Sequence, residues 1–138
     1  MMATFLAHMH VKPGFEAAYE RTAAALRDAT HANESRLLRY EYWRGGEPGT
    51  YYTLASFEDF DAFLEHQTSD HHERIGRELM TFVDDISFEW VDPLSEASPL
   101  PATDMQALPT GASELTASYH ERFAVRDRDW WMVLREGG

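Results

Sequence analysis

The stretch RLLRYEYWRGGEPGTYYTLA, residues 36–55, decides the fold of this chain. Residues 36–44 are rich in aromatic side chains and alternate in polarity, and residues 50–55 are again typical of a strand. Between them lies GGEPG, a run of residues that favour turns. Two strand patterns separated by five turn residues indicate a β-hairpin, so we expect two antiparallel strands here.

A strand and a helix are predicted before this hairpin. Residues 4–12 alternate and stop at Pro13-Gly14. One face of this strand carries Phe5, Ala7, Met9 and Val11, and the other carries Leu6, His8 and His10. From Phe15 the apolar residues recur every three or four positions, which predicts an amphipathic helix that ends near residues 31–33.

After the hairpin the sequence predicts two helical segments and a last strand. Ser56 with Asp59 three residues later resembles a capping box in front of a helical pattern. Asp70 with Glu73 offers a second, weaker start signal. Residues 86–91 alternate again before Asp92-Pro93, which favours a strand.

The order strand, helix, strand, strand, helix pair, strand predicts an α+β fold of the ferredoxin-like, split βαβ type. We expect a four-stranded antiparallel sheet with its helices on one face. The other face also carries apolar residues, and we expect a second copy of the chain to cover it, giving a homodimer through the sheet face.

The chain divides into three parts on this interpretation. Residues 1–93 form the folded domain, and residues 94–112 are a proline-rich linker. Residues 113–138 are too apolar to remain in water and too short to fold alone. We expect this extension to dock on the domain or across the dimer as an extra strand or hairpin, turning at residues 126–129, with a terminal helix as the alternative.

Composition narrows the classes of function. The chain has 138 residues, a formal net charge of -12 and no cysteine. The negative charge disfavours nucleic-acid and membrane-surface roles, and the absence of cysteine removes thiol chemistry. Neither a signal sequence nor a membrane span is evident, so we expect a cytoplasmic protein. There is also no glycine-rich nucleotide loop and no nucleophile elbow.

Histidines are the main candidates for chemistry. The stretch HQTSDHH, residues 66–72, holds three of the seven histidines of the chain. His71 and His72 precede Ile75 by four and three residues, so either imidazole can lie beside the inward stripe of a helix, or both can be the solvated start of that helix. His8 and His10 share a strand face. This placement is typical of a dimer face or a polar ligand cavity, and it also allows a three-ligand metal site with His71 or Glu41. We assign no metal ligand and no cofactor.

An aromatic band crosses the predicted strands. Its members are Tyr40, Tyr42, Trp43, Tyr51, Tyr52, Phe57 and Trp90. Such residues pack cores and interfaces, or they line an apolar cavity that fits a flat aromatic ligand. We take Tyr40, Tyr52, Phe57 and Trp90 as candidate ligand contacts.

The order of several short motifs over residues 4–93 resembles the antibiotic biosynthesis monooxygenase (ABM) domains. The motifs are Val11-Lys12-Pro13-Gly14, Leu38-Arg39-Tyr40-Glu41, and Phe57-Glu58 followed by His66 and His71. In many quinol-oxidising relatives the last stretch has the form W-E-S-x-x-x-L-x-x-H-L-x-S-P-H, with which His66, Ser69 and His71 are in register. The resemblance implies a dimeric α+β barrel.

The resemblance also implies a function. Some relatives oxygenate anthrones with an Asn and a Trp at the positions of Thr53 and Phe57, and haem-degrading relatives use residues where this chain has Ala7, Phe57 and Gly76. We therefore expect a monooxygenase that needs no cofactor and acts on a small aromatic quinol or anthrone-like phenol, with His71 as the base and His66 in support. Alternatives are a non-catalytic dimeric module that binds a small ligand or a partner protein, and a haem-binding protein.

Overall fold

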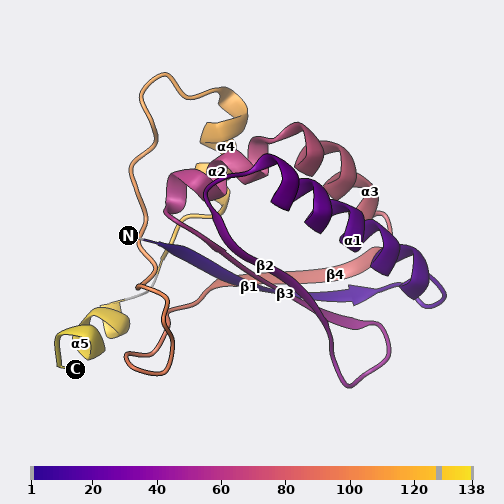
Figure 1. Cartoon of the computed structure of the whole chain (residues 1–138), viewed down its shortest axis with the longest axis horizontal. Helices are drawn as coiled ribbons and strands as arrows, with labels where there is room; N and C mark the ends of the chain where they lie inside the picture. Colours follow the sequence, from indigo (N-terminus) through magenta and orange to yellow (C-terminus); the bar gives the residue numbers. More distant parts are fainter. Residues whose placement is uncertain (1, 127–128, 138) are drawn as a thin grey trace.

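The computed structural model describes residues 2–126 and 129–137 and confirms the predicted fold class. Four strands form one antiparallel sheet in the order β2-β3-β1-β4 (Figure 1). The strands are β1 (Ala3–Val11), β2 (Leu37–Arg44), β3 (Thr50–Phe57) and β4 (Val83–Trp90). The hairpin of β2 and β3 therefore has the five-residue loop expected from the sequence.

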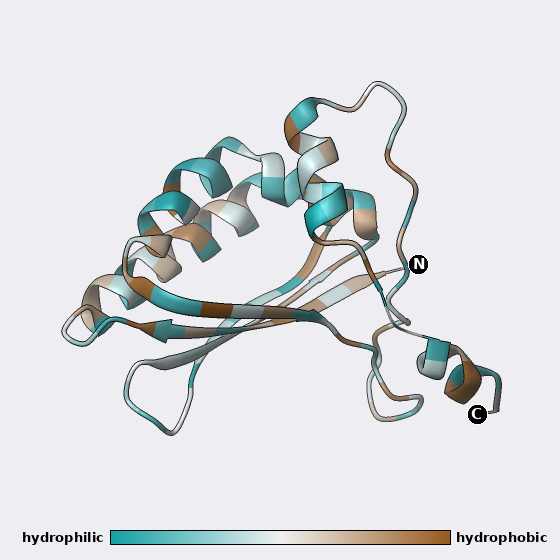
Figure 2. Cartoon of the chain, turned by 180° about the vertical axis from the view of Figure 1, so that it is seen from behind, coloured by the Kyte–Doolittle hydropathy of each residue, from teal (hydrophilic) through white to brown (hydrophobic). Residues whose placement is uncertain are grey.

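Helices cover one face of the sheet (Figure 1). They are α1 (Glu16–Asn33), α2 (Phe60–Thr68), a π-helical turn η1 (His72–Gly76) and α3 (Arg77–Met80). Hydrophilic residues lie along much of this helical layer, whereas hydrophobic residues are frequent in the strands (Figure 2). The arrangement is the split βαβ plan with its helices on one side.

The register of the strands assigns each side chain to a face. Ala7 of β1 lies opposite Thr53 of β3 and Phe88 of β4 on the face toward the helices. One residue further, His8 lies opposite Tyr52, and their rings meet at 4.9 Å on the uncovered face. Because side chains alternate along a strand, the two sets never share a face.

Aromatic rings fill the space between the sheet and the helices. The side chains of Tyr19, Phe57, Phe60 and Phe63 are fully buried. Phe63 of α2 packs edge to face on both Phe57 and Phe5, at ring separations of 5.8 and 5.9 Å. These rings fix the distance of α2 from the sheet.

The cap of α2 differs from the prediction. Asp59, not Ser56, is the N-cap residue, and its side chain accepts a hydrogen bond from the backbone N–H of Ala62 at 2.8 Å. Ser56 still belongs to β3, where its hydroxyl bonds that of Thr4 at 2.9 Å. The strand runs two residues further than its alternation indicated, because Ser56 and Phe57 are both buried against β1.

The C-terminal extension is helical, and the expectation of a strand or hairpin is wrong. It forms α4 (Glu114–Arg122) and α5 (Asp129–Gly137), and part of the expected turn, residues 127–128, lies outside the described residues. Ser113 caps α4 by accepting from the N–H of Thr116 at 3.1 Å. Spacings of four residues, such as Tyr119 to Phe123, fit a strand face and a helix face equally, and the cap decides between them.

Helix α4 packs against α2. Trp90 at the end of β4 donates its indole N–H to the carbonyl of Phe123 at 2.6 Å, and His120 lies edge to face on Phe60 at 5.5 Å.

Within the described residues, no helix has the length and apolar character that crossing a membrane requires.

Candidate functional site

The break between α2 and η1 sets the directions of three histidines. Ser69 ends α2 in an extended conformation, and its hydroxyl donates to the carbonyl of His66 at 2.7 Å. His66 therefore lies in the last turn of α2, while His71 and His72 begin the next helical segment. That segment is a π-helical turn, a feature often found at functional sites because it changes the direction of side chains.

Two of these histidines converge on Glu34, the residue that ends α1. One oxygen of Glu34, Oε2, lies 2.9 Å from Nδ1 of His66 and 2.5 Å from Nε2 of His71. The exposed fractions of the side chains are 11% for Glu34, 1% for His66 and 10% for His71. A buried carboxylate thus holds two imidazoles contributed by two other segments.

The contacts with Glu34 assign one N–H in each ring. A carboxylate can only accept, so Nδ1 of His66 and Nε2 of His71 carry the protons. Burial alone would raise the pKa of Glu34, but the hydrogen bonds and charges of His66 and His71 outweigh burial and lower that pKa. Glu34 is therefore ionised at neutral pH, and in the neutral form of the His66 ring, with Nδ1–H donating to Glu34, the lone pair is on Nε2.

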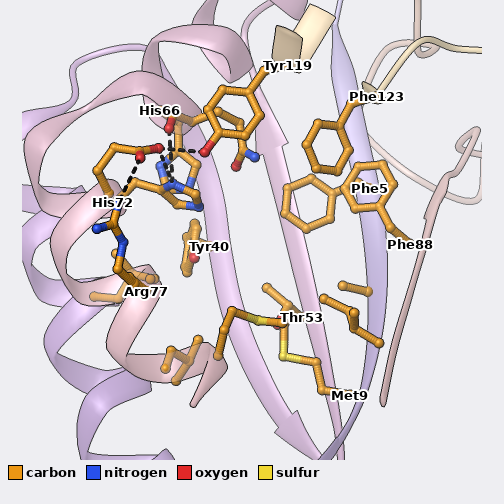
Figure 3. A pocket seen from close by; sticks show the side chains of 18 of the residues that line it. Phe5, Met9, Tyr40, Thr53, His66, His72, Arg77, Phe88, Tyr119 and Phe123 are labelled. Carbon is orange, nitrogen blue, oxygen red and sulfur yellow. Dashed lines mark hydrogen bonds and ion pairs between the residues drawn. The ribbon is translucent and has the colours of Figure 1, made fainter. Parts of the chain in front are cut away.

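A cavity of about 590 Å³ lies between the sheet, α2, η1, α3 and α4 (Figure 3). Most of its wall is apolar or aromatic: Phe5, Ala7, Met9, Leu26, Leu79, Met80, Ile86, Phe88 and Phe123. His66 lines this cavity, whereas Glu34 and His71 do not. Since Nδ1 of His66 is turned to Glu34, Nε2 is the ring nitrogen that remains for a contact with a ligand.

His72 also lines the cavity and differs from His66 in its partners (Figure 3). Its Nδ1 donates to the carbonyl of Gln67 at 3.1 Å, which leaves Nε2 as an acceptor. Burial, with the neighbouring His66, lowers the pKa of His72 to about 3. His72 is thus a neutral imidazole across the physiological range and a weak base.

Two tyrosines and a threonine supply neutral polar groups on the sheet side. The hydroxyls of Tyr40 and Tyr42 bond each other at 3.0 Å, and burial raises the pKa of both. Thr53 Oγ1 is buried and has no hydrogen bond among the described residues. The Tyr19 hydroxyl lies close to Thr53 and donates to the sulfur of Met9 at 3.0 Å. Buried polar atoms are normally paired, so Thr53 offers a free position for a ligand oxygen.

Helix α4 closes one side of the cavity (Figure 3). Tyr119 donates its hydroxyl proton to Glu73 of η1 at 2.5 Å, and Phe123 packs on Phe88 at 4.8 Å. Because Glu73 also lies in the cavity wall, this bond joins the extension to the segment that carries His72.

The structure separates the residues predicted for the site. His66 and Tyr40 line the cavity, Phe57 packs beneath the His66 ring at 5.3 Å, and His71 lies behind that ring. Trp90 lies at the edge of this core, 4.8 Å from the ring of Phe63. The remaining candidates, His8, His10 and Tyr52, are on the uncovered face of the sheet.

The metal site considered for His8 and His10 does not form with His71. The sheet separates these histidines from His71, and Nδ1 of His10 instead contacts Asp84 at 2.8 Å. Glu41 on the same uncovered face pairs with Arg39 at 2.8 Å. In the described part of the chain, the grouping of potential metal ligands is Glu34, His66 and His71.

Sequence reasoning missed Glu34, the inward position of His72 and the α4 wall. Glu34 follows the predicted end of α1, and its contacts reach 32 and 37 residues along the chain, which no local pattern encodes. His72 had a signal, since it lies three residues before Ile75, but the spacing did not separate it from His71.

The sequence was compared with protein-family models and with curated protein sequences. A family model described as antibiotic biosynthesis monooxygenase (ABM) matches residues 2–78. No curated protein sequence matches the chain.

Solved structures share the fold. A Caulobacter crescentus protein that bears the same family name is 25% identical, with a TM-score of 0.64 over 68% of this chain and 91% of its own. Rv0793 of Mycobacterium tuberculosis is 18% identical, with a TM-score of 0.64 over 71% of this chain and 100% of its own. A Bacteroides thetaiotaomicron protein with the family name is 16% identical, with a TM-score of 0.65 over 76% of this chain and 96% of its own. With the family model matching more than half of the sequence and the fold in agreement, this chain belongs to the antibiotic biosynthesis monooxygenase family.

Proposed function

We propose that the protein is a cofactor-independent monooxygenase that oxidises a small aromatic quinol or anthrone-like phenol, with His66 as the general base. The observation that carries this proposal is the contact of His66 with Glu34. It leaves a lone pair on Nε2 of a buried imidazole that lines an apolar cavity. The family membership supports the class of reaction, and the size and apolar wall of the cavity support a small aromatic substrate.

This assignment moves the base from His71 to His66. His71 has the same carboxylate partner but is not in the cavity wall. His72 is in the wall, but its lowered pKa makes it a poor proton acceptor, because a general base works best with a pKa near the operating pH. His66 has both the cavity position and a carboxylate that stabilises the imidazolium formed when it accepts a proton.

The reaction needs a base and dioxygen. His66 Nε2 removes a proton from the phenol or from the acidic carbon of its keto form. The resulting anion passes electrons to O2, and a carbon–oxygen bond forms to give a hydroperoxide. Loss of water from this hydroperoxide breaks the O–O bond and leaves a new carbonyl. One oxygen atom enters the product, the other leaves in water, and the substrate supplies all four electrons.

The remaining polar groups suit the orientation of a phenolic ligand. Tyr40 and Tyr42 stay neutral because their pKa is raised. One of them donates to the other, so the second hydroxyl can donate to a ligand oxygen, and His72 Nε2 can accept from a ligand hydroxyl. Thr53 Oγ1 offers one further hydrogen bond. A cavity near 590 Å³ lies in the range that accommodates small organic ligands.

Oxygen uptake by metal-stripped protein tests the proposal. Small hydroquinones and anthrones are offered to the wild type, His66→Ala and His71→Ala, with the protein-free rate as the baseline. We expect uptake by the wild type that falls to near the baseline in His66→Ala and less in His71→Ala. Uptake that is unchanged in His66→Ala would contradict the assigned base.

Failure of every substrate would point to the other functions. A ligand-binding module would bind the same phenols, measured by quenching of tyrosine and tryptophan fluorescence, without consuming oxygen. A haem-binding protein would shift the Soret band of added haemin, and the shift would be lost on substitution of the histidine that ligates iron.

We also propose that a second copy covers the open sheet face. Trp43 on this face is 57% exposed, and the His8–Tyr52 ring pair and Leu54 lie beside it on the same side of the sheet. Exposed aromatic residues are enriched in homodimer interfaces. Sedimentation of the wild type and of Leu54→Lys tests this: a dimer that dissociates in the variant is expected, and a monomeric wild type would refute it.

A further inference from the structure

The Glu34 cluster has the composition and geometry of a metal site. One atom each from Glu34, His66 and His71 lie within 4.8 Å of one another. The three side chains come from the end of α1, the last turn of α2 and the residue before η1. We propose that these three residues bind one divalent transition-metal ion of the Zn²⁺ type, and that this ion switches off the base.

The donor set selects the class of ion. Two imidazole nitrogens and one carboxylate oxygen are ligands of Zn²⁺ and of non-haem Fe²⁺. Mg²⁺ and Ca²⁺ prefer oxygen ligands, so a site with two imidazoles disfavours them. The net charge of -12 adds a favourable field for any cation.

The distances need only a small adjustment. Zn²⁺ bonds of about 2.0–2.1 Å in tetrahedral geometry place neighbouring ligand atoms roughly 3.3 Å apart. The hydrogen-bonded separations to Glu34 Oε2 are 2.9 Å for His66 and 2.5 Å for His71. Placing one ion among the three atoms therefore opens the two separations to Glu34 by less than about 1 Å, and in each neutral imidazole the displaced proton moves to the other ring nitrogen.

The consequence for His66 follows from its two nitrogens. In the metal-free protein Nδ1 of His66 donates to Glu34, so a neutral ring has its lone pair on Nε2. An ion bound to Nδ1 displaces that proton, and a neutral imidazole then carries its proton on Nε2. His66 becomes a donor toward the cavity and can no longer accept a proton. This regulatory step depends on the proposed function, whereas metal binding does not.

Zn²⁺ binding is measured first, on the metal-stripped full chain. Titration in competition with a chromophoric chelator should give one ion per chain. Glu34→Gln and His71→Ala should each weaken binding by more than about tenfold, since even indirect partners of a metal ligand contribute tenfold or more. Circular dichroism shows whether each variant keeps the fold, and Glu34→Gln, which preserves shape, covers the case in which His71→Ala does not.

His10→Ala is the matched control. His10 also contacts a carboxylate, Asp84, at 2.8 Å, but this pair is about half exposed, and no third ligand joins it within the described part of the chain. Its substitution should leave Zn²⁺ affinity within about twofold of the wild type. Binding that is absent from the wild type, or equally weakened by His10→Ala, would overturn the proposal.

Oxygen uptake then tests the switch. Saturating Zn²⁺ should lower the rate at least tenfold, and chelator should restore it. Tight Zn²⁺ binding with an unchanged rate would refute the switch and keep the site. If the metal-free protein shows no uptake, the proposed function has failed, and the titration alone still decides the metal site.

Discussion

The molecule contains two histidine–carboxylate contacts of nearly equal length in opposite settings. His66 meets Glu34 at 2.9 Å between the C-terminal ends of α2 and α1, with side chains 1% and 11% exposed. His10 meets Asp84 at 2.8 Å near the end of the uncovered sheet face, with side chains 47% and 43% exposed. Contact length therefore does not distinguish a candidate base from a surface ion pair. Burial, a second imidazole and an adjoining cavity do.

The environment changes what such a pair can do. Water screens the exposed pair, so it contributes little to stability and does not fix the tautomer of its ring. The buried pair has a defined donor and acceptor, because the carboxylate cannot donate. Substitutions in the His66–Glu34 pair and in the His10–Asp84 pair should therefore have unequal effects.

The largest expected effect comes from removal of each histidine. His66→Ala should lower the initial rate of oxygen uptake by about 10²–10⁴, the usual contribution of a positioned general base. His10→Ala should stay within roughly twofold, because an exposed pair supplies little energy. Equal losses in the two variants would mean that burial does not set the difference.

Replacement of each carboxylate asks whether the partner matters. Glu34→Gln keeps the shape but removes the charge that stabilises an imidazolium on His66. We expect the oxygen-uptake rate to fall about a hundredfold, near the lower end of what a positioned base contributes. Asp84→Asn should leave the rate unchanged. A fully active Glu34→Gln enzyme would show that His66 acts without its partner.

The stability of the two faces should differ as their chemistry does. Phe57, fully buried beneath His66, should cost about 3–5 kcal/mol of unfolding free energy when changed to alanine. Trp43→Ala on the open face should cost less than about 1 kcal/mol in the monomer. Denaturant unfolding at two protein concentrations measures both values. A Trp43→Ala cost that grows with concentration would locate Trp43 in the dimer interface.

The smallest effect is expected for a carboxylate outside both pairs. Hydrogen bonds from Arg44 and Tyr51 lower the pKa of Glu20 to about 2, below its ordinary value of 4.5. The folded state therefore binds this proton less readily than the unfolded state. Its contribution to stability is present above pH 4.5 and is lost as the pH falls toward 2. The side chain of Glu20 is 35% exposed and that of Arg44 is 76% exposed, so water screens the pair and the contribution is less than about 1 kcal/mol.

Acid unfolding of the wild type and Glu20→Gln measures this contribution. The difference between their unfolding free energies should shrink as the pH falls through this window. A difference that is constant with pH would show that the bonds to Arg44 and Tyr51 do not persist in solution.

The alternation of strands allowed much of the fold to be predicted. The parity of residues 4–11 correctly separated Phe5 and Ala7 from His8 and His10, and the GGEPG turn fixed the hairpin. The alternation shows which residues share a face of the sheet, but it does not show which of the two faces the helices cover. The histidines of both faces therefore entered one list of candidates.

The candidate site was less predictable, because its contacts join distant segments. His66 was found through its register with a family pattern, but the role of Glu34 depends on where α1 ends relative to α2. His72 lines the cavity where His71 was expected, and this depends on a π-helical turn, which shifts side-chain directions without a sequence signal of its own. The α4 wall was missed because the spacing of Tyr119 and Phe123 fits both a helix and a strand.

The most direct test of the central claim is the protonation of the His66 ring in the metal-stripped protein at neutral pH. Nitrogen-15 NMR of histidine-labelled protein, with His66→Gln to assign the signals, distinguishes the two tautomers. A neutral ring with its proton on Nδ1 and an unprotonated Nε2 is predicted, because Glu34 holds the Nδ1 proton. A proton on Nε2, or rapid exchange between tautomers as expected for the exposed His10, would contradict the assignment of His66 as the base.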